Sequence, residues 1–419
     1  MINHKKEVEL GSVSFITKLA GFEHTEYIQP NATKVKINYD DVPMFIGMNI
    51  KNGRLTDKIS WFLPKKISMQ LHRSALTKKC LVLPYVGSVG DVAVFNSTDR
   101  HHLASNVAKI ELIDDAPFST EYLYYFLKSP FGQKKLLFYI QGGIQKNITM
   151  DAIRKTIIPI PENGDRLVQV LTALDTKIEL NNRINVELES MTKTLYDYWF
   201  VQFDFPDKNG KPYKTSGGKM VWNEQLKREI PEGWEVEALF TAMDVQYGFP
   251  FSTSKFTDIV TDKAVVRIRD ILQNTISTYT TEVVDEKYQL KQNDLLIGMD
   301  GNFHLNFWDK EGAYLNQRSV RIRERDDKVI SSLQAFFELK PHIKARENNV
   351  SRTTVGHLSD KDLKRLYLIS PNPKGNFNPK ATFNSFLDKI ISNRIQNQKL
   401  VELRDWLLPM LMNGQIKVH

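Results

Sequence analysis

Two stretches of the chain carry apolar and polar residues with the spacing of long amphipathic helices. They run from about Asp165 to Phe200 and from about Ala381 to Met412. Their stripe positions follow at intervals of 4, 3, 4, 3, 3 and 4 residues, which is typical of a coiled-coil seam. The first stripe reads Leu174, Ile178, Asn181, Asn185, Leu188, Met191 and Leu195, and the second reads Phe386, Ile390, Asn393, Asn397, Leu400, Leu403 and Leu407. One constant offset relates every position to its counterpart, and Asn matches Asn, so the pattern predicts an internal repeat.

A helix of this length needs a partner as long as itself. Roughly 32–36 residues at about 1.5 Å per residue span about 50 Å, which is too long to pack on one small domain. We therefore expect the two helices to pair antiparallel and to act as a rigid spacer. The Asn layers have two interpretations, fixing the register of the pair or contacting a partner protein, and we favour register.

The segments that precede the helices also repeat, at nearly the same offset, with small shifts that indicate short insertions. Leu81-Val82-Leu83 matches Leu295-Leu296-Ile297, and residues 157–161 match residues 367–371. Short β-branched strands alternate there with Gly and Asn turns, which is typical of β-rich α+β domains. The predicted fold class is therefore α+β, with two similar β-rich domains joined by two long antiparallel coiled-coil helices in a pseudo-twofold internal repeat.

These patterns divide the chain into five predicted segments. The β-rich domains occupy 1–164 and 233–380, the spacer helices occupy 165–203 and 381–419, and a turn-rich connection occupies 204–232. Gly, Pro and Lys are frequent in the connection. Its apolar residues Tyr213, Met220, Val221 and Trp222 are expected to anchor it against one end of the helical pair.

Composition narrows the class of protein. The chain has 419 residues, a formal net charge of +8 and a pI near 9.1, which favours a polyanionic partner only mildly. Its single cysteine, Cys80, excludes an intramolecular disulfide and a cysteine-based zinc cluster. The sequence carries no run of about 18 apolar residues and no evident signal peptide, so we expect a cytoplasmic protein.

A search for catalytic motifs finds none. The chain lacks a phosphate-binding loop, a G-x-G-x-x-G turn, an amino-methyltransferase motif and a His-Glu-x-x-His pair. His101 and His102 are adjacent, which is the wrong spacing for two ligands on one helix face. We therefore predict a non-catalytic chain with no cofactor or metal of its own.

Polar and basic loops are the candidate DNA-binding elements. Gln and Asn can pair with adenine, Arg and Lys with guanine, and Ser or Thr with either. The first candidate loop contains Gln145, Lys146 and Asn147, and its counterpart contains Ser351, Arg352 and Thr353. The alternative is a solvated loop whose amides cap the backbone. Because such a loop recurs in both halves, we favour binding.

Further candidates have evenly balanced structural and functional interpretations. One strand follows the segment Arg100-His101-His102-Leu103-Ala104-Ser105-Asn106, and its counterpart follows Leu315-Asn316-Gln317-Arg318-Ser319. The structural interpretation of Asn106 is that it satisfies the start of the strand. Lys65, Lys66, Arg73, Arg267 and Arg269 are candidates for phosphate contacts, with surface solubility as the alternative. Ser88 in the first half corresponds to Asn302 and His304 in the second, at turn tips that differ as expected if the halves read different sequences.

Several of these segments resemble the specificity subunits of type I restriction–modification systems. The similarity covers essentially the whole chain and is most specific in the two helices and in one short segment. These parts are Leu174-Asp175-Thr176-Lys177-Ile178-Glu179-Leu180-Asn181-Asn182-Arg183-Ile184-Asn185, Leu195-Tyr196-Asp197-Tyr198-Trp199-Phe200, Ile230-Pro231-Glu232-Gly233-Trp234 and Gln398-Lys399-Leu400-Val401-Glu402-Leu403-Arg404-Asp405. Leu103-Ala104-Ser105-Asn106 and Gln145-Lys146-Asn147-Ile148 also look familial.

The resemblance implies that the β-rich domains are target-recognition domains, each reading half of a split double-stranded DNA sequence, with the helices setting the gap. It also implies partners: two methyltransferase (modification) subunits that use S-adenosylmethionine on adenine N6, and restriction subunits, the motor-nucleases. S-adenosylmethionine, ATP and Mg would reside on those partners. The alternatives are a stand-alone bipartite DNA-binding regulator and a self-contained DNA-cutting or DNA-methylating enzyme.

Overall fold

A computed structural model describes residues 6–51, 53–56, 58–139, 147–348, 356–372 and 377–416. The chain forms two compact units. Unit 1 comprises Met1–Lys177 with Leu400–His419, and unit 2 comprises Ile178–Lys399. Both long helices are therefore shared between the two units.

Unit 1 is built on two four-stranded sheets. The first has the order β2 (Ser14–Lys18), β11 (Val107–Leu112), β8 (Cys80–Pro84), β9 (Ala93–Phe95) and is antiparallel. The second has the order β6 (Phe62–Leu63), β3 (Val42–Phe45), β10 (His101–Leu103), β7 (Ala75–Leu76), with β3 and β10 parallel. Two further pairs are β1 (Glu7–Glu9) with β12 (Ile157–Pro159) and β4 (Ile50–Lys51) with β5 (Arg54–Leu55). The short helices are α1 (Gly21–Glu23), α2 (Lys65–Ser68), α3 (Thr120–Lys128), α4 (Pro130–Leu136) and α5 (Met150–Arg154).

Unit 2 repeats this plan. Its first sheet has the order β16 (Asp244–Tyr247), β23 (Ser319–Arg323), β20 (Leu295–Gly298), β21 (Leu305–Phe307). The second has the order β17 (Phe256–Thr257), β19 (Thr278–Thr280), β18 (Ala264–Val266), β22 (Tyr314–Leu315), with β18 and β22 parallel. Two pairs remain, β15 (Glu235–Ala238) with β24 (Tyr367–Ser370) and β13 (Met220–Asn223) with β14 (Arg228–Pro231). The helices are α7 (Leu239–Ala242), α8 (Ile268–Ile271), α9 (Ser332–Asn348) and α10 (Asp360–Lys364).

The predicted α+β repeat is thus confirmed. The first sheets match strand by strand, whereas the parallel pair lies in the middle of the second sheet in unit 1 and at its edge in unit 2. In each unit an antiparallel four-stranded sheet accompanies a second sheet that contains one parallel pair, β3–β10 in unit 1 and β18–β22 in unit 2. Short helices begin at matching hydroxyl caps: Thr149 accepts from the Ala152 amide and Ser359 from the Asp362 amide.

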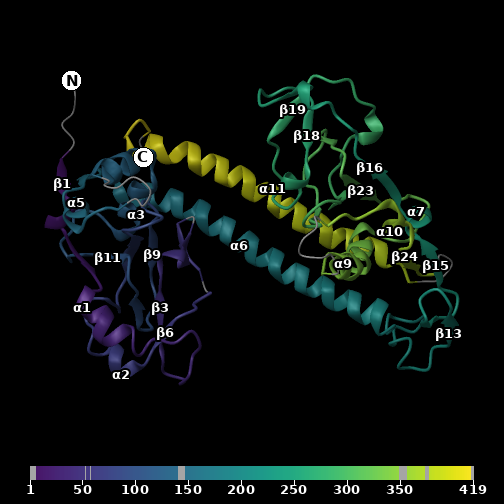
Figure 1. Cartoon of the computed structure of the whole chain (residues 1–419), viewed down its shortest axis with the longest axis horizontal. Helices are drawn as coiled ribbons and strands as arrows, with labels where there is room; N and C mark the ends of the chain where they lie inside the picture. The colour runs from purple at the N-terminus through teal and green to yellow at the C-terminus, as the bar shows by residue number, and fades with distance from the viewer. Residues whose placement is uncertain are drawn as a thin grey trace. The chain divides into compact units, whose positions relative to one another are not determined.

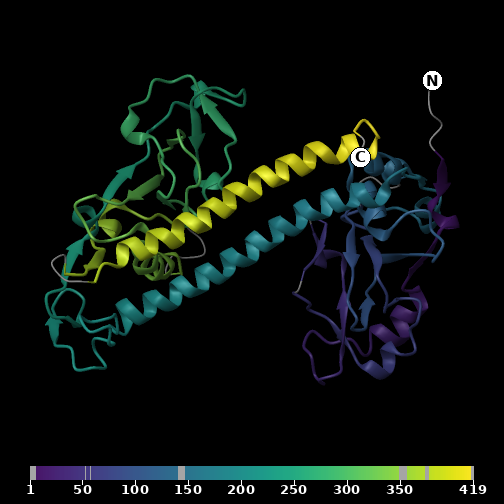
Figure 2. The same cartoon turned by 180° about the vertical axis from the view of Figure 1, so that it is seen from behind.

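The long helices are α6 (Gly164–Tyr196, 33 residues) and α11 (Pro379–Met412, 34 residues). Figures 1 and 2 show them side by side. Within unit 2, Asn181 Nδ2 donates to Asn397 Oδ1 at 2.9 Å and Asn393 Nδ2 donates to Asn185 Oδ1 at 2.8 Å. Residue numbers rise along one helix as they fall along the other, so the pair is antiparallel. The seam amides bond to each other, as the register interpretation requires.

Within unit 1 the same two helices are joined by an ion pair. Arg404 Nη1 donates to Asp175 Oδ1 at 2.8 Å, and both side chains are largely buried. The Tyr125 hydroxyl donates to the other Asp175 oxygen at 2.9 Å. This carboxylate is satisfied on both sides, which offsets the cost of burying the pair.

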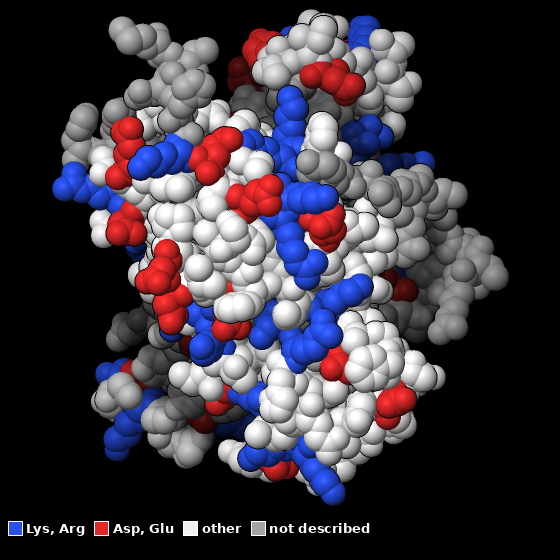
Figure 3. Space-filling view, turned by 90° about the vertical axis from the view of Figure 1, so that its left-hand side faces the viewer, with Lys and Arg blue, Asp and Glu red and all other residues white. Residues whose placement is uncertain are grey.

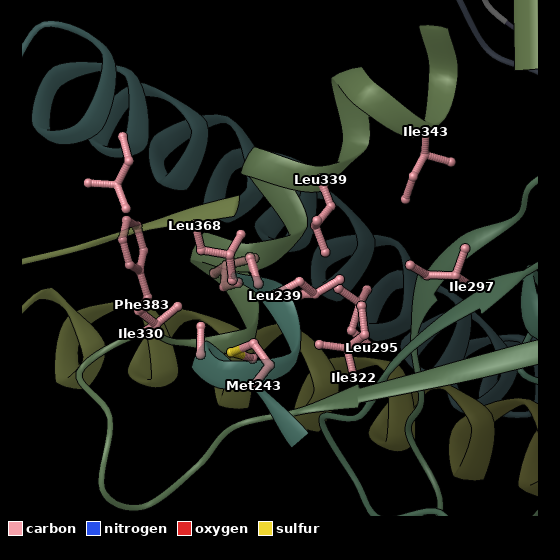
Figure 4. Packing of buried hydrophobic residues seen from close by; sticks show 14 of the residues in the cluster. Leu239, Met243, Leu295, Ile297, Ile322, Ile330, Leu339, Ile343, Leu368 and Phe383 are labelled. Carbon is pink, nitrogen blue, oxygen red and sulfur yellow. The ribbon is translucent and has the colours of Figure 1, made fainter. Parts of the chain in front are cut away.

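Each core includes side chains from both long helices. In unit 1, Leu167 and Leu171 of α6 and Leu408 and Leu411 of α11 belong to the buried cluster. In unit 2 the cluster contains Phe383 of α11 together with residues of α7, α9 and the first sheet (Figure 4). Leu195 of α6 packs against this cluster.

The connection after α6 continues as a π-helical turn, Asp197–Val201, and then as the β13–β14 hairpin. Tyr213, Met220 and Val221 pack against the unit 2 core, as predicted. The prediction was wrong for Trp222, which is 58% exposed. Val221 pairs with buried Ile230, but Trp222 lies nearer the hairpin turn, where its indole donates to Glu224.

The Asn185–Asn393 contact gives a stability prediction. Asn185→Ala leaves the buried Asn393 amide without its acceptor and should lower the free energy of unfolding by about 1–3 kcal/mol. Replacing both residues by Leu removes the polar groups together and should cost much less. Urea unfolding of the full chain measures both, and equal losses would contradict the register role.

One position of the repeat exchanges a core aromatic residue for a carboxylate. Phe126 of α3 is fully buried, whereas α9 carries Glu338 at the equivalent position of the second repeat. The Glu338 carboxylate accepts from the Ile369 amide at 2.9 Å and from Gln334 Nε2 at 2.8 Å. Burial raises the pKa of Glu338 to about 7.

This raised pKa predicts that unit 2 loses stability as the pH rises. The folded state favours the protonated acid, so its contribution is full below the ordinary pKa of 4.5 and declines towards pH 7, by up to about 3 kcal/mol. Glu338→Gln should have a flatter profile of melting temperature between pH 5 and 8 than the wild type. Parallel profiles would refute the assignment.

Candidate nucleic-acid interface

Unit 2 contains a hollow of about 460 Å³ that collects five of the predicted DNA-binding residues. Its walls come from the start of α8, the turn between β20 and β21, and the turn between β22 and β23. The predicted residues are Arg267, Arg269, His304, Gln317 and Arg318, and the remaining wall is Phe251, Thr253, Phe256, Ile268 and Asn316. The five lie in three separate segments of the sequence, and folding brings them together.

The α8 side of the hollow is fixed by a buried carboxylate. Asp270, 2% exposed, accepts from the Arg267 backbone amide at 3.0 Å through Oδ2. Its Oδ1 accepts from the Ser277 hydroxyl at 3.0 Å. The backbone that carries Arg267 and Arg269 is therefore held by a side chain that does not itself line the hollow.

The opposite side is the turn that carries Gln317 and Arg318. The Gln317 amide donates to the Phe249 carbonyl, and the Arg318 carbonyl accepts from the Met299 amide, both at 2.8 Å. Arg318 has φ 67°, in the left-handed region that few arginines adopt. Backbone bonds hold this turn, and the side chains of Gln317 and Arg318 are exposed.

The hollow has a cationic and amide-rich lining. Arg267 lies 5.7 Å from the ring centroid of Phe256, and Arg269 Nη2 donates to the Ser277 hydroxyl at 3.0 Å. Arg318 Nε lies 3.6 Å from a carboxylate oxygen of Asp300. Among the described residues that form the wall, none is acidic. Three guanidinium groups and two side-chain amides suit a ligand rich in hydrogen-bond acceptors.

A family model described as type I restriction modification DNA specificity domain matches residues 8–190 and 231–404. The two matched stretches cover most of the chain and correspond to the two repeats. The chain belongs to this family of specificity subunits.

The chain is similar to specificity subunits from several organisms. The MjaIX specificity subunit of Methanocaldococcus jannaschii is 24% identical over 364 residues, covering 82% of this chain and 78% of that protein. The HindI specificity subunit of Haemophilus influenzae is 24% identical over 338 residues, covering 67% and 74%. The EcoBI specificity subunit of Escherichia coli is 33% identical over 143 residues, 34% of this chain and 30% of that protein. A solved S subunit from M. genitalium, 15% identical, has the same fold, with a TM-score of 0.53 over 98% of this chain and 97% of that one.

The predicted DNA-binding residues of unit 1 fall into two groups, those that are exposed and those that have partners within the protein. Lys65, Lys66, Arg73, Ser88 and Asn147 are exposed. Arg100 and His101 have internal partners. Arg100 Nε donates to Ser68 Oγ at 2.8 Å and Nη2 to the Ser68 carbonyl at 2.7 Å, and partial burial lowers the pKa of Arg100. The His101 ring stacks on Phe45 with centroids 5.2 Å apart.

The remaining predicted residues lie beside the hollow or outside the described residues. Asn302 is exposed beside the hollow residue His304, whose amide donates to the Asn302 carbonyl. Gln145, Lys146, Ser351, Arg352 and Thr353 lie outside the described residues. No group of three or more His, Cys, Asp or Glu side chains suited to a metal occurs among the residues described, and none of the described helices could span a membrane.

Surface charge elsewhere is mixed rather than cationic. Figure 3 shows Lys and Arg interspersed with Asp and Glu across one face. In unit 1, Lys135 lies 2.9 Å from Glu7, and Lys78 lies 3.8 Å from Glu111. In these pairs a carboxylate lies beside each lysine, whereas the hollow brings three arginines together with no carboxylate in its described wall.

The counterparts of Gln317 and Arg318 in unit 1 belong to the candidate segment that begins with Arg100 and His101 and ends at Asn106. Ser105 and Asn106 are the repeat equivalents of Gln317 and Arg318, at the same offset that relates the long helices. Asn106 has φ 69°, nearly the value of Arg318.

The two groups of unit 1 residues predict different mutant phenotypes. Arg100→Ala removes the guanidinium that donates to the buried Ser68 hydroxyl and carbonyl, of which the carbonyl keeps the Leu71 amide, and should lower the free energy of unfolding by about 1–3 kcal/mol. Lys65→Ala and Lys66→Ala, on the exposed side of α2, should change it by less than about 0.5 kcal/mol. Each should instead reduce the salt dependence of DNA binding by about 0.9 in the logarithmic slope. Urea unfolding and binding titrations at several salt concentrations test both, and an unchanged slope would reject phosphate contact by these lysines.

Proposed function

We propose that this chain recognises a bipartite double-stranded DNA target, one half-site per unit. The hollow of unit 2 is the observation that carries the proposal, because three arginines and a glutamine line it and its described wall holds no carboxylate. Arg and Gln are the side chains that pair bidentately with the major-groove edges of guanine and adenine. The repeated fold provides a second reading unit of the same design.

The proposal assigns the chemistry to partner subunits. The chain directs adenine methylation or DNA cleavage without carrying it out, and two modification subunits and the restriction subunits supply it. S-adenosylmethionine, ATP and Mg are then cofactors of those partners. The repeat supports two like partners, because each unit combines one β-rich repeat with a segment of both long helices.

Methylome sequencing tests this function. In a host that expresses the modification subunits, we expect N6-methyladenine in a bipartite motif only when this gene is present. A catalytically intact host with the gene deleted and then restored is the control. Methylation that is independent of the gene, or confined to one uninterrupted motif, would refute the proposal.

A stand-alone regulator predicts a different result. It would bind a bipartite sequence tightly without partners and leave the methylome unchanged. Comparing the binding of the isolated chain with that of its complex with the modification subunits separates the two functions.

A further inference from the structure

The two units build the same backbone frame around one turn. In unit 2 the Asn316 amide donates to the Val266 carbonyl at 3.0 Å, and the Met299 amide donates to the Arg318 carbonyl at 2.8 Å. In unit 1 the Ala104 amide donates to the Phe45 carbonyl at 2.9 Å, and the Tyr85 amide donates to the Asn106 carbonyl at 3.0 Å. With φ of 67° at Arg318 and 69° at Asn106, the turns are equivalent.

The helical turn that carries Arg267 in unit 2 also has an equivalent in unit 1. Arg267 caps α8 with φ −104° and ψ 166°, and Asp270 accepts its amide. Ile46 caps the 3-10 turn Gly47–Asn49 with φ −101° and ψ 166°, and Asn49 accepts its amide at 2.9 Å. Arg267 therefore corresponds to Ile46, and Arg269 two residues later corresponds to Met48.

The side chains on this common frame differ completely. Unit 2 presents Arg267, Arg269, Gln317 and Arg318, whereas unit 1 presents Ile46, Met48, Ser105 and Asn106. Met48 is 72% exposed, an apolar side chain that its own unit leaves uncovered. The frame is retained while its chemistry changes from cationic to apolar and amide, as expected of two readers of different half-sites.

We propose that these turns are specificity-determining, with Arg318 and Gln317 reading a guanine-containing pair and Asn106 with Met48 reading an adenine–thymine pair. The inference rests on the proposed function. Guanine offers two acceptors, N7 and O6, to a guanidinium, adenine pairs with an asparagine amide, and the thymine methyl takes an apolar contact. The alternative ligand for the arginines of the hollow is a DNA phosphate, which accepts hydrogen bonds as guanine does but carries no sequence information.

Arg318 is the arginine best placed to read a base. Its side chain is 60% exposed, and its Nε lies 3.6 Å from a carboxylate oxygen of Asp300, beyond hydrogen-bond distance. Arg269 bonds the hydroxyls of Ser277 and Thr278, and Arg267 lies against Phe256. We assign Arg267 and Arg269 to positioning the DNA through its phosphate backbone, and Arg318 to contacting the edge of a base.

The test is binding selection from a randomised DNA pool by the complex of the full chain with its modification subunits, at one salt concentration. The variants are Arg318→Asn, which places the unit 1 residue in a left-handed position that Asn tolerates, and Asn106→Gly, which removes the amide at a φ suited to Gly. Lys227→Asn is the matched control, because Lys227 is also a cation at positive φ, 52°, but lies in the β13–β14 turn.

Arg318→Asn should lower the preference for guanine at one position of one half-site by about 5- to 150-fold, the range of a lost bidentate pair. The other half-site and the gap should stay unchanged. Asn106→Gly should relax an adenine–thymine position in the other half-site, and Lys227→Asn should leave both as in the wild type.

Three results would overturn the inference. One is a wild-type preference in both half-sites that neither variant alters. Another is a uniform loss of affinity across sequences with Arg318→Asn, which would make Arg318 a phosphate contact. The third is a loss of guanine preference with Lys227→Asn as well. A wild-type complex without any bipartite preference would instead refute the proposed function, and this inference with it.

Discussion

The antiparallel pairing of α6 and α11 is the constraint on which the rest of the structure depends. A helix of more than thirty residues cannot bury its apolar stripe on a single small unit. Here the two helices pack against each other. Each also contributes side chains to both cores, Leu171 and Leu411 in unit 1 and Leu195 and Phe383 in unit 2. Each unit therefore needs chain from both halves of the sequence before its core is complete.

Buried polar groups specify how the helices meet. Leucine contacts along a seam tolerate a shift of one helix by one turn relative to the other. A buried amide that hydrogen-bonds to an amide on the other helix does not tolerate such a shift. Asn185 with Asn393 performs this role in unit 2, and Asp175 with Arg404 performs it in unit 1. The position equivalent to Asp175 is Leu387 and that equivalent to Arg404 is Thr192, both buried. The repeat has thus diverged into an ion pair in unit 1 and uncharged residues in unit 2, and the helix ends are not interchangeable.

The same separation of frame and side chain occurs within the units. Tyr122 of α3 donates to the Pro159 carbonyl, and Gln334 of α9 donates to the Ile369 carbonyl. Different side chains tie the helix to equivalent strands, so the contact has been retained while the residue has changed. At the turns that carry Asn106 and Arg318 the backbone is likewise retained, and the exposed side chains differ.

The sequence alone determined the repeat, the two long helices, the α+β class and the family, because periodic apolar positions and offsets are local and additive signals. It also selected Arg267, Arg269, His304, Gln317 and Arg318, by residue type. Tertiary structure decided that these five share one hollow, while Arg100 is turned inward to Ser68 and His101 onto Phe45. An exposed arginine and one that ties a helix to a strand look alike in a sequence. Only packing, which joins residues far apart in the chain, distinguishes a side chain left free to bind from one already engaged.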